Sequence, residues 1–397
     1  MKKSKNLKKN LILMSKSRIL FIIPGFGLGG TTTALASMFN CGLSEYFDID
    51  VFPICQRNYS QQPLISYDIG MNGLTTAYYG DFSRFNTKEK LKYLFIKLLK
   101  QNKHFIEKLE KWVITKTIKE IERHNHYDVV VGFQEGQATQ FASHFSCPHK
   151  IAWIHCDYAK TFGKEVDEID IYSHFEKIVC VSQFTRQGFI GCYPSLADKT
   201  IAIHNLFDAE HIERLSKATI DDQRFDTSQF TIISLGRVHD VKRFYLIPEI
   251  AAQLKKENMD FRWYILGSSD IPSELKRLMD AIHSYGMEEN VIYLGGKSNP
   301  YPYLKAADLL VTISKSEACP MIFNEAKILH VPILSVDFGS AFEFIEQGKD
   351  GYISSLKLLP HKLIELTNQP EVISSIQNYE WKGNNDEIFE QLYALFY

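Results

Sequence analysis

The sequence has no apolar run long enough to cross a bilayer. Residues 19–23 form a short apolar run that Pro24 and Gly25 interrupt, whereas a spanning helix needs about 20 apolar residues. The run is also shorter than the apolar part of a secretory signal peptide. We therefore expect a cytoplasmic protein.

Cysteine motifs are equally scarce. The seven cysteines are odd in number and form no C-x-x-C pair, although zinc sites and disulfide frameworks both depend on such regular spacing. The first half of the chain also has no isolated D-x-D after an apolar strand. We therefore expect a reducing compartment, no bound metal and no resident cofactor.

A strong net charge is absent as well. The 397 residues carry a net charge of −2, which gives no overall attraction to nucleic acid. Charged residues make up 23% of the chain and hydrophobic residues 45%, as in soluble globular proteins. The length exceeds that of one ordinary core and predicts two domains.

The pattern that is present is an alternation of short apolar runs with helical segments. Such runs are typical of parallel strands that are buried on both faces. The expected strands are residues 18–23, 49–54, 127–133, 150–154, 178–181, 200–203, 230–235, 262–266, 290–294 and 308–314. We therefore predict an α/β protein with two parallel-sheet domains facing a cleft.

The change in composition after residue 205 sets the domain limits. Residues 206–228 are charged and poorly periodic, which indicates a hinge and linker. The predicted division is a first domain at 1–205, the linker, a second domain at 229–380, and a terminal helix within 381–397.

The loop after the first strand contains the pattern G-x-G-x-x-G at residues 25–30. In dinucleotide-binding folds this turn is followed by an acidic residue at the end of the second strand. Here Asp48 and Asp50 stand at the start of that strand and no acidic residue ends it, so NAD is disfavoured. The loop then either faces another ligand or is only a tight turn.

The most informative stretch is residues 314–332, SKSEACPMIFNEAKILHVP. It leads from a strand into a helix that begins near Pro320, with Glu317 before the helix and Glu325 inside it. Unpaired N–H groups and a partial positive charge make a helix start suitable for a diphosphate or sugar oxygens. Each carboxylate can accept hydrogen bonds from two hydroxyl groups. A purely structural role at a helix start is the alternative.

This carboxylate pair, with its flanks at 299–308 and 333–353, resembles the signature of retaining GT-B glycosyltransferases, especially family 4 (group 1). The resemblance implies two Rossmann-like domains, with the terminal helix crossing back onto the first. It also implies transfer from a nucleotide sugar, most commonly a UDP-sugar, to a saccharide or lipid-linked saccharide in bacterial surface polysaccharide synthesis. The sequence departs from the family at Ala318, Cys319 and His330.

The resemblance also suggests roles for individual residues. Arg237 and Lys242, in GRVHDVKRF, would stabilise the diphosphate, and a pair of solvated surface cations is the alternative. Glu317 would hold a sugar hydroxyl, and His155, which follows the strand at 150–154, would lie near the reaction centre. The predicted donor-binding residues are Gly236, Glu325, Gly29, Gly30, Gly295 and Tyr303.

Three further expectations follow from the sequence. Ser182 is placed as the N-cap of a helix. Glu343 lies in a loop that matches the family, or else serves only as a helix-start acid. Residues 88–119 are rich in Lys and aromatic residues, and they form either a solvated helix face or, with the basic residues at 1–18, a peripheral contact with an anionic membrane.

Two other functions remain open at this stage. A GT-B epimerase or hydrolase would turn over the nucleotide sugar without an acceptor. A binding protein would keep the cleft without turnover, although the presence of Arg237, Lys242, Glu317 and Glu325 argues against it.

Overall fold

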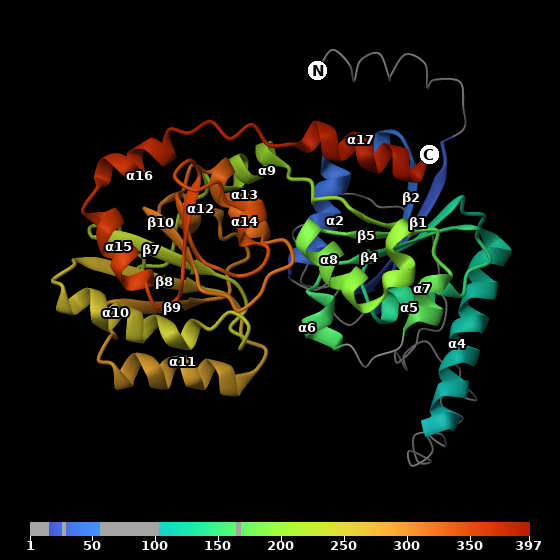
Figure 1. Cartoon of the computed structure of the whole chain (residues 1–397), viewed down its shortest axis with the longest axis horizontal. Coiled ribbons are helices and arrows are strands. Elements are labelled where there is room, and N and C mark those ends of the chain that lie inside the picture. Colours follow the sequence, from blue (N-terminus) through green and yellow to red (C-terminus); the bar gives the residue numbers. More distant parts are fainter. Residues whose placement is uncertain (1–15, 26–28, 56–102, 164–167) are drawn as a thin grey trace.

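The computed structural model describes residues 16–25, 29–55, 103–163 and 168–397. They form two lobes side by side, each built on one sheet with helices around it (Figure 1). Among the described residues, no helix combines the length and apolar character needed to span a membrane.

The first lobe contains a six-stranded parallel sheet in the order β2-β1-β3-β4-β5-β6. Its strands are β1 (Arg18–Gly25), β2 (Asp48–Cys55), β3 (Val129–Gly132), β4 (His149–Ile154), β5 (Lys177–Cys180) and β6 (Thr200–Ala202). Its helices are α2 (Gly30–Asn40), α4 (Lys103–His124), α5 (Gln137–Ser143), α6 (Tyr158–Phe162), α7 (Ile169–Ser173) and α8 (Gln183–Cys192).

The second lobe contains another six-stranded parallel sheet, in the order β12-β11-β10-β7-β8-β9. Its strands are β7 (Phe230–Leu235), β8 (Phe261–Leu266), β9 (Val291–Gly295), β10 (Leu309–Thr312), β11 (Ile333–Val336) and β12 (Gly351–Ser354). The helices of the second half of the chain are α9 (Ala209–Leu215), α10 (Ile247–Lys256), α11 (Pro272–Ser284), α12 (Tyr301–Lys305), α13 (Met321–Ile328), α14 (Ala341–Phe344), α15 (Leu359–Thr367), α16 (Pro370–Gln377) and α17 (Asn385–Phe396). The two sheets confirm the predicted α/β fold class.

The strand order explains where a ligand would bind. In the second sheet β7 lies between β8 and β10, so the connections leave β7 and β10 in opposite directions. Parallel sheets bind ligands beyond the carboxyl ends of strands at such a reversal. The loops after β7 and β10 carry Lys242 and Glu317, which brings these two residues to one edge of the sheet.

The last helix, α17, leaves the second lobe and lies across the first (Figure 1). Its residues Ile388, Leu392 and Phe396 are buried in a core that also contains Phe21 and Phe47. The ring centroid of Phe396 lies 5.8 Å from those of both phenylalanines, in edge-to-face geometry. The chain end thus ties the lobes together through apolar packing.

Residues 206–228 are not the simple linker that their composition suggests. They include α9, and the buried side chains Phe207 and Ile212 belong to the core of the second lobe. Polarity and weak periodicity could not reveal this packing, because the apolar side chains that reach the core, which also include Leu215, Ile220 and Phe225, are irregularly spaced among charged residues.

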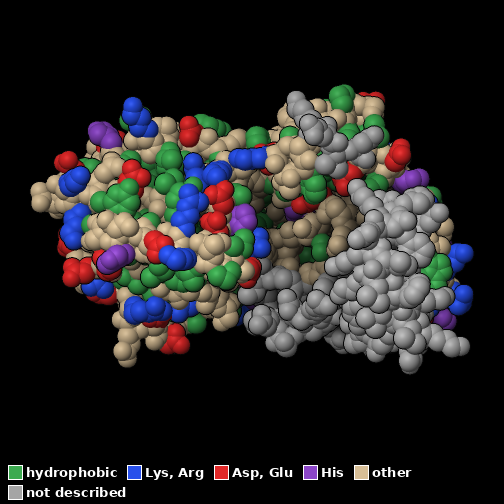
Figure 2. All heavy atoms as spheres, turned by 90° about the horizontal axis from the view of Figure 1, so that it is seen from below, with side chains coloured by type: hydrophobic (Ala, Val, Ile, Leu, Met, Phe, Trp, Pro, Cys, Tyr) green, Lys and Arg blue, Asp and Glu red, His purple; other side chains and the backbone are tan. Residues whose placement is uncertain are grey.

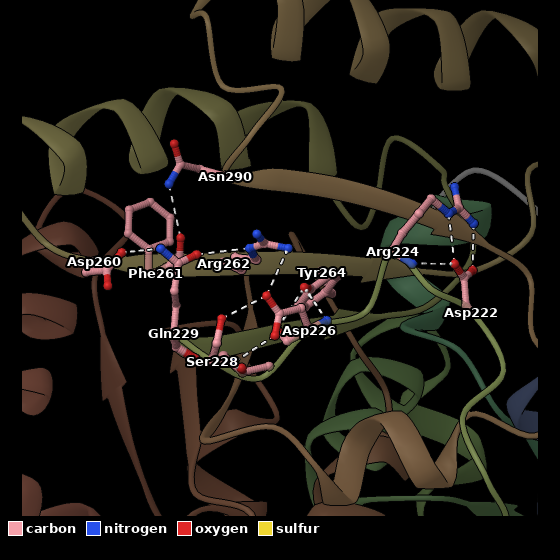
Figure 3. A network of polar contacts seen from close by, with 11 residues as sticks. Asp222, Arg224, Asp226, Ser228, Gln229, Asp260, Phe261, Arg262, Tyr264 and Asn290 are labelled. Atoms are coloured by element: carbon pink, nitrogen blue, oxygen red, sulfur yellow. Dashed lines mark hydrogen bonds and ion pairs between the residues drawn. The ribbon is translucent and has the colours of Figure 1, made fainter.

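The rest of this stretch is fixed along the sheet by polar contacts (Figure 3). The Arg224 guanidinium donates to both carboxylate oxygens of Asp222, at 2.9 and 2.7 Å. The Tyr264 hydroxyl accepts the N–H of Asp226 at 2.8 Å and donates to its carbonyl oxygen at 2.9 Å. Residues 216–228 are therefore part of the second lobe.

The Lys-rich segment is described only from residue 103 onward, so residues 88–102 lie outside the described residues. Helix α4 buries Ile114, Ile118 and Ile121 on one face and leaves the Trp112 side chain 47% exposed on another. This is the pattern of a helix with its apolar face on the core. Contact with a membrane stays a prediction.

Candidate active site

A cavity of about 740 Å³ lies between the lobes, and Figure 2 shows a hollow there. From the first lobe, Gly29, Gly30, Thr31, Thr33, His155, Val181 and Asn205 line it. From the second lobe, its lining includes Gly236, Arg237, Lys242, Gly267, Gly296, Tyr301, Glu317 and Glu325. Eight of the predicted site residues thus meet at one place.

The strongest polar contact in the cavity joins Lys242 to Glu317. The Lys242 Nζ lies 2.6 Å from the Glu317 Oε1, and the two side chains are 21% and 17% exposed. A short, half-buried pair of this kind is stronger than a surface ion pair. The pair places one cation and one carboxylate where a charged sugar derivative can contact both.

Two glycines beside Lys242 leave no room for a side chain at their positions. Gly236 has a φ of 142°, and a Cβ atom there would lie 2.7 Å from the Lys242 Cε. A Cβ atom on Gly267 would overlap the carbonyl oxygen of Gly236. Sequence analysis singled out Gly236 but missed Gly267, because the close approach of two strand ends leaves no local sequence signal.

Arg237 is held much more loosely than Lys242. Its side chain is 62% exposed, and its Nη1 lies 3.7 Å from the Asp270 Oδ2. The guanidinium can therefore move toward an anion in the cavity at little cost.

Glu325 is a buried carboxylate in the first turns of α13. Its Oε1 accepts a hydrogen bond of 3.3 Å from the Tyr301 hydroxyl. Burial raises the pKa of Glu325 to about 7, although Tyr301 and the positive charge of Lys242 act in the opposite direction. Tyr301 was not predicted as a site residue, although it stands two positions from Tyr303.

The raised pKa of Glu325 predicts how stability depends on pH. Between 4.5 and about 7 the folded protein holds a proton on Glu325 that the unfolded chain releases, so the unfolding free energy falls as pH rises. At about 1.4 kcal/mol per pH unit, the loss is about 3 kcal/mol. Urea unfolding across this range should show the wild type losing that amount of unfolding free energy relative to Glu325→Gln, whose side chain does not titrate. A difference that stays constant with pH would contradict the burial of an ionisable carboxyl.

His155 follows β4 at the edge of the cavity. Its backbone N–H donates to the Glu135 Oε2 at 2.7 Å, and its ring lies 4.7 Å from that of Phe133. Burial lowers the pKa of His155 to about 3, so the ring is neutral at pH 7. Its buried Nε2 has no hydrogen-bond partner among the described residues. A neutral nitrogen of this kind can bind a sugar hydroxyl.

Two predicted donor-binding residues, Gly295 and Tyr303, are not among the residues that line the cavity. Gly295 ends β9, and the neighbouring Gly296 lines the cavity instead. Tyr303 is buried, with its ring 5.1 Å from that of Phe225. Residues two apart on a helix point in different directions, so Tyr301 faces the cavity and Tyr303 does not.

At His330, where the sequence departs from the family, the backbone is in a conformation that favours glycine. His330 follows α13 with a φ of 59°, in the left-handed region where glycine is least strained.

Among the described residues, no group of three or more His, Cys, Asp or Glu side chains is placed to hold a metal ion.

Comparison with known proteins finds a family match within the second half of the chain. Residues 216–371 match the family model "Glycosyl transferases group 1". An O-antigen biosynthesis glycosyltransferase from Escherichia coli is 31% identical over 118 residues, 30% of this chain and 32% of that protein. An amylovoran biosynthesis glycosyltransferase from Erwinia amylovora is 22% identical over 241 residues, 59% and 65% of the two chains. The matches thus span less than two thirds of these relatives.

Solved structures extend the likeness to the fold of the whole chain. The structure of Anabaena HepE in complex with UDP-glucose superposes with a TM-score of 0.66 at 17% identity, and covers 95% of this chain and 99% of that one. The two parallel sheets with a cavity between them agree with this likeness, and so does the family match at residues 216–371. This chain has the GT-B fold, and its residues 216–371 are similar to the glycosyl transferases group 1 family.

Proposed function

We propose that this protein is a retaining glycosyltransferase that moves a sugar from a nucleotide sugar to a saccharide or lipid-linked saccharide. The observation that carries the proposal is the cavity in which Lys242, Glu317 and Glu325 surround the start of α13. Relatives named for O-antigen and amylovoran biosynthesis support a role in bacterial surface polysaccharide synthesis. The UDP-glucose complex of HepE supports a UDP-sugar donor.

In the proposed reaction the acceptor hydroxyl oxygen bonds to the anomeric carbon on the face from which the diphosphate leaves. The bond between that carbon and the phosphate oxygen breaks, and a leaving-group oxygen takes the acceptor proton. Lys242 and Arg237 stabilise the growing negative charge. Glu317 holds a hydroxyl of the donor sugar, Glu325 holds the ribose, and the neutral His155 contacts the sugar near the reaction centre.

The proposed reaction uses no metal or resident cofactor, because two cationic side chains serve the leaving diphosphate. We place the reaction in the cytoplasm, where cysteines such as the partly buried Cys319 remain reduced. We also propose peripheral attachment to an anionic membrane through the basic segments at 1–18 and 88–119.

A panel of nucleotide sugars tests the proposal. The donor should raise the apparent melting temperature, since a ligand that binds only the folded state stabilises it. The same donor should be consumed only when a saccharide acceptor is present, and consumption should continue in EDTA. Consumption of donor without acceptor would favour the epimerase or hydrolase, binding without any turnover would favour the binding protein, and loss in EDTA restored by manganese would refute metal independence.

A further inference from the structure

Glu343 was singled out in the sequence, and the proposed reaction does not use it. It lies in the first turn of α14, in the second lobe, yet its carboxylate reaches the first lobe. Its Oε1 accepts the backbone N–H of Gln183 at 2.7 Å, and its Oε2 accepts that of Phe184 at 3.1 Å. Its Oε1 also lies 2.6 Å from the His204 Nε2. A single side chain of one lobe thus holds three groups of the other.

These partners suit a charged carboxylate. Gln183 and Phe184 begin α8, where N–H groups lack partners within the helix and the helix dipole is positive. Burial alone would raise the pKa of Glu343, but the hydrogen bonds from His204, Gln183 and Phe184 hold it below its usual value. The carboxylate therefore remains ionised and accepts all three bonds.

A second contact beside Glu343 brings the lobes equally close. A Cβ atom on Gly339 would overlap the ring of Phe184. The absence of a side chain at Gly339 therefore lets the ring of the first lobe rest on the backbone of the second. Two separate observations, one polar and one steric, thus place the start of α8 against residues 339–343.

This contact region is joined directly to the loop that carries Glu317. The Ser340 hydroxyl donates to the Glu317 carbonyl oxygen at 2.6 Å. On the other side of the loop, the Ser316 hydroxyl donates to the Asp157 Oδ2 of the first lobe at 2.9 Å. The position of Glu317 therefore depends on how the two lobes are joined.

We propose that Glu343 is a positioning residue that latches the two lobes together, in what we call the closed arrangement, and thereby holds Glu317 in place for transfer. The role in transfer rests on the proposed function, whereas the latch itself does not. The latch is defined as the contact of Glu343 and Gly339 with Gln183, Phe184 and His204.

Glu343→Ala tests the polar part of the latch. Loss of hydrogen bonds to a charged group should lower the ratio of closed to open molecules by about tenfold or more. Small-angle X-ray scattering should then show a larger radius of gyration than in the wild type. The kcat should fall in proportion to the fraction of closed molecules, while the Kd for UDP should stay within about twofold, because Arg237, Lys242 and Glu325 all lie in the second lobe.

Glu346→Ala is the matched control. Glu346 lies three positions away, is exposed, and pairs only with Lys349 of its own segment among the contacts described. This variant should keep the radius of gyration and the kcat of the wild type. Equal scattering and kcat for Glu343→Ala and the wild type would refute the latch.

A steric pair tests the proposal by a second route that leaves Glu343 intact. Gly339→Ala should open the lobes because its Cβ displaces Phe184, and adding Phe184→Ala should restore both the radius of gyration and the kcat. Failure of the second change to restore closure would overturn the proposal. If no nucleotide sugar is turned over at all, the proposed function fails, while the scattering still decides whether the latch exists.

Discussion

Replacing Lys242 by alanine should lower turnover at saturating donor by about two to three orders of magnitude, the scale for losing one group that stabilises charge in the transition state. Lys242 is half-buried and 2.6 Å from Glu317, so water cannot simply replace it. Its loss also leaves the Glu317 carboxylate beside the diphosphate with no compensating charge. Steady-state kinetics with the donor identified by the panel would measure the effect.

The comparison variants are Arg237→Ala and Lys276→Ala. Arg237 is 62% exposed. We expect its removal to lower turnover by only about tenfold, because solvent partly replaces an exposed, mobile cation. Lys276 pairs with Asp280 on the exposed face of α11 and should be replaceable without effect. Full turnover by Lys242→Ala would show that the charge of the leaving group is stabilised elsewhere.

Gly267→Ala should disrupt the second lobe and the site together. The added Cβ atom would overlap the carbonyl oxygen of Gly236, where the loop carrying Arg237 begins. A clash with backbone cannot be relieved by rotating a side chain, so we expect at least the upper end of the usual cost of overpacking, about 3 kcal/mol. Urea unfolding and turnover would measure the two consequences.

Gly296→Ala is the matched control for this prediction. Gly296 also lines the cavity, but a Cβ atom there would lie 3.4 Å from the nearest atoms, in Ser268, which is ordinary contact. The unfolding free energy of Gly296→Ala should lie within about 0.5 kcal/mol of the wild-type value. Equal stability of the two alanine variants would mean that the turn after β7 can move away from Gly267.

Much of the fold follows from local sequence patterns. Continuous apolar runs predicted β1 to β10 because a strand buried on both faces tolerates little else, whereas β11 and β12 were not among the expected strands. The start of α8 was predicted from Ser182, whose hydroxyl accepts the Thr185 N–H at 3.0 Å. The proximity of Lys242 and Glu317 could also be anticipated, because parallel topology gathers the carboxyl ends of strands at one edge.

Other features were decided only by tertiary packing. The charged composition of residues 206–228 concealed α9, in which Ile212 is buried and Leu215 packs against the core of the second lobe. Helical phase, fixed by where α12 begins, turned Tyr301 rather than Tyr303 toward Glu325.

The two longest-range features were beyond any local pattern. Gly267 is required by the approach of Gly236, 31 positions earlier by their numbers, and Glu343 contacts Gln183 across 160 positions. A sequence motif records which side chains are present along one segment. Which carboxylate meets which N–H group is set by how the two lobes pack against each other, since Glu343 and Gln183 stand on different lobes.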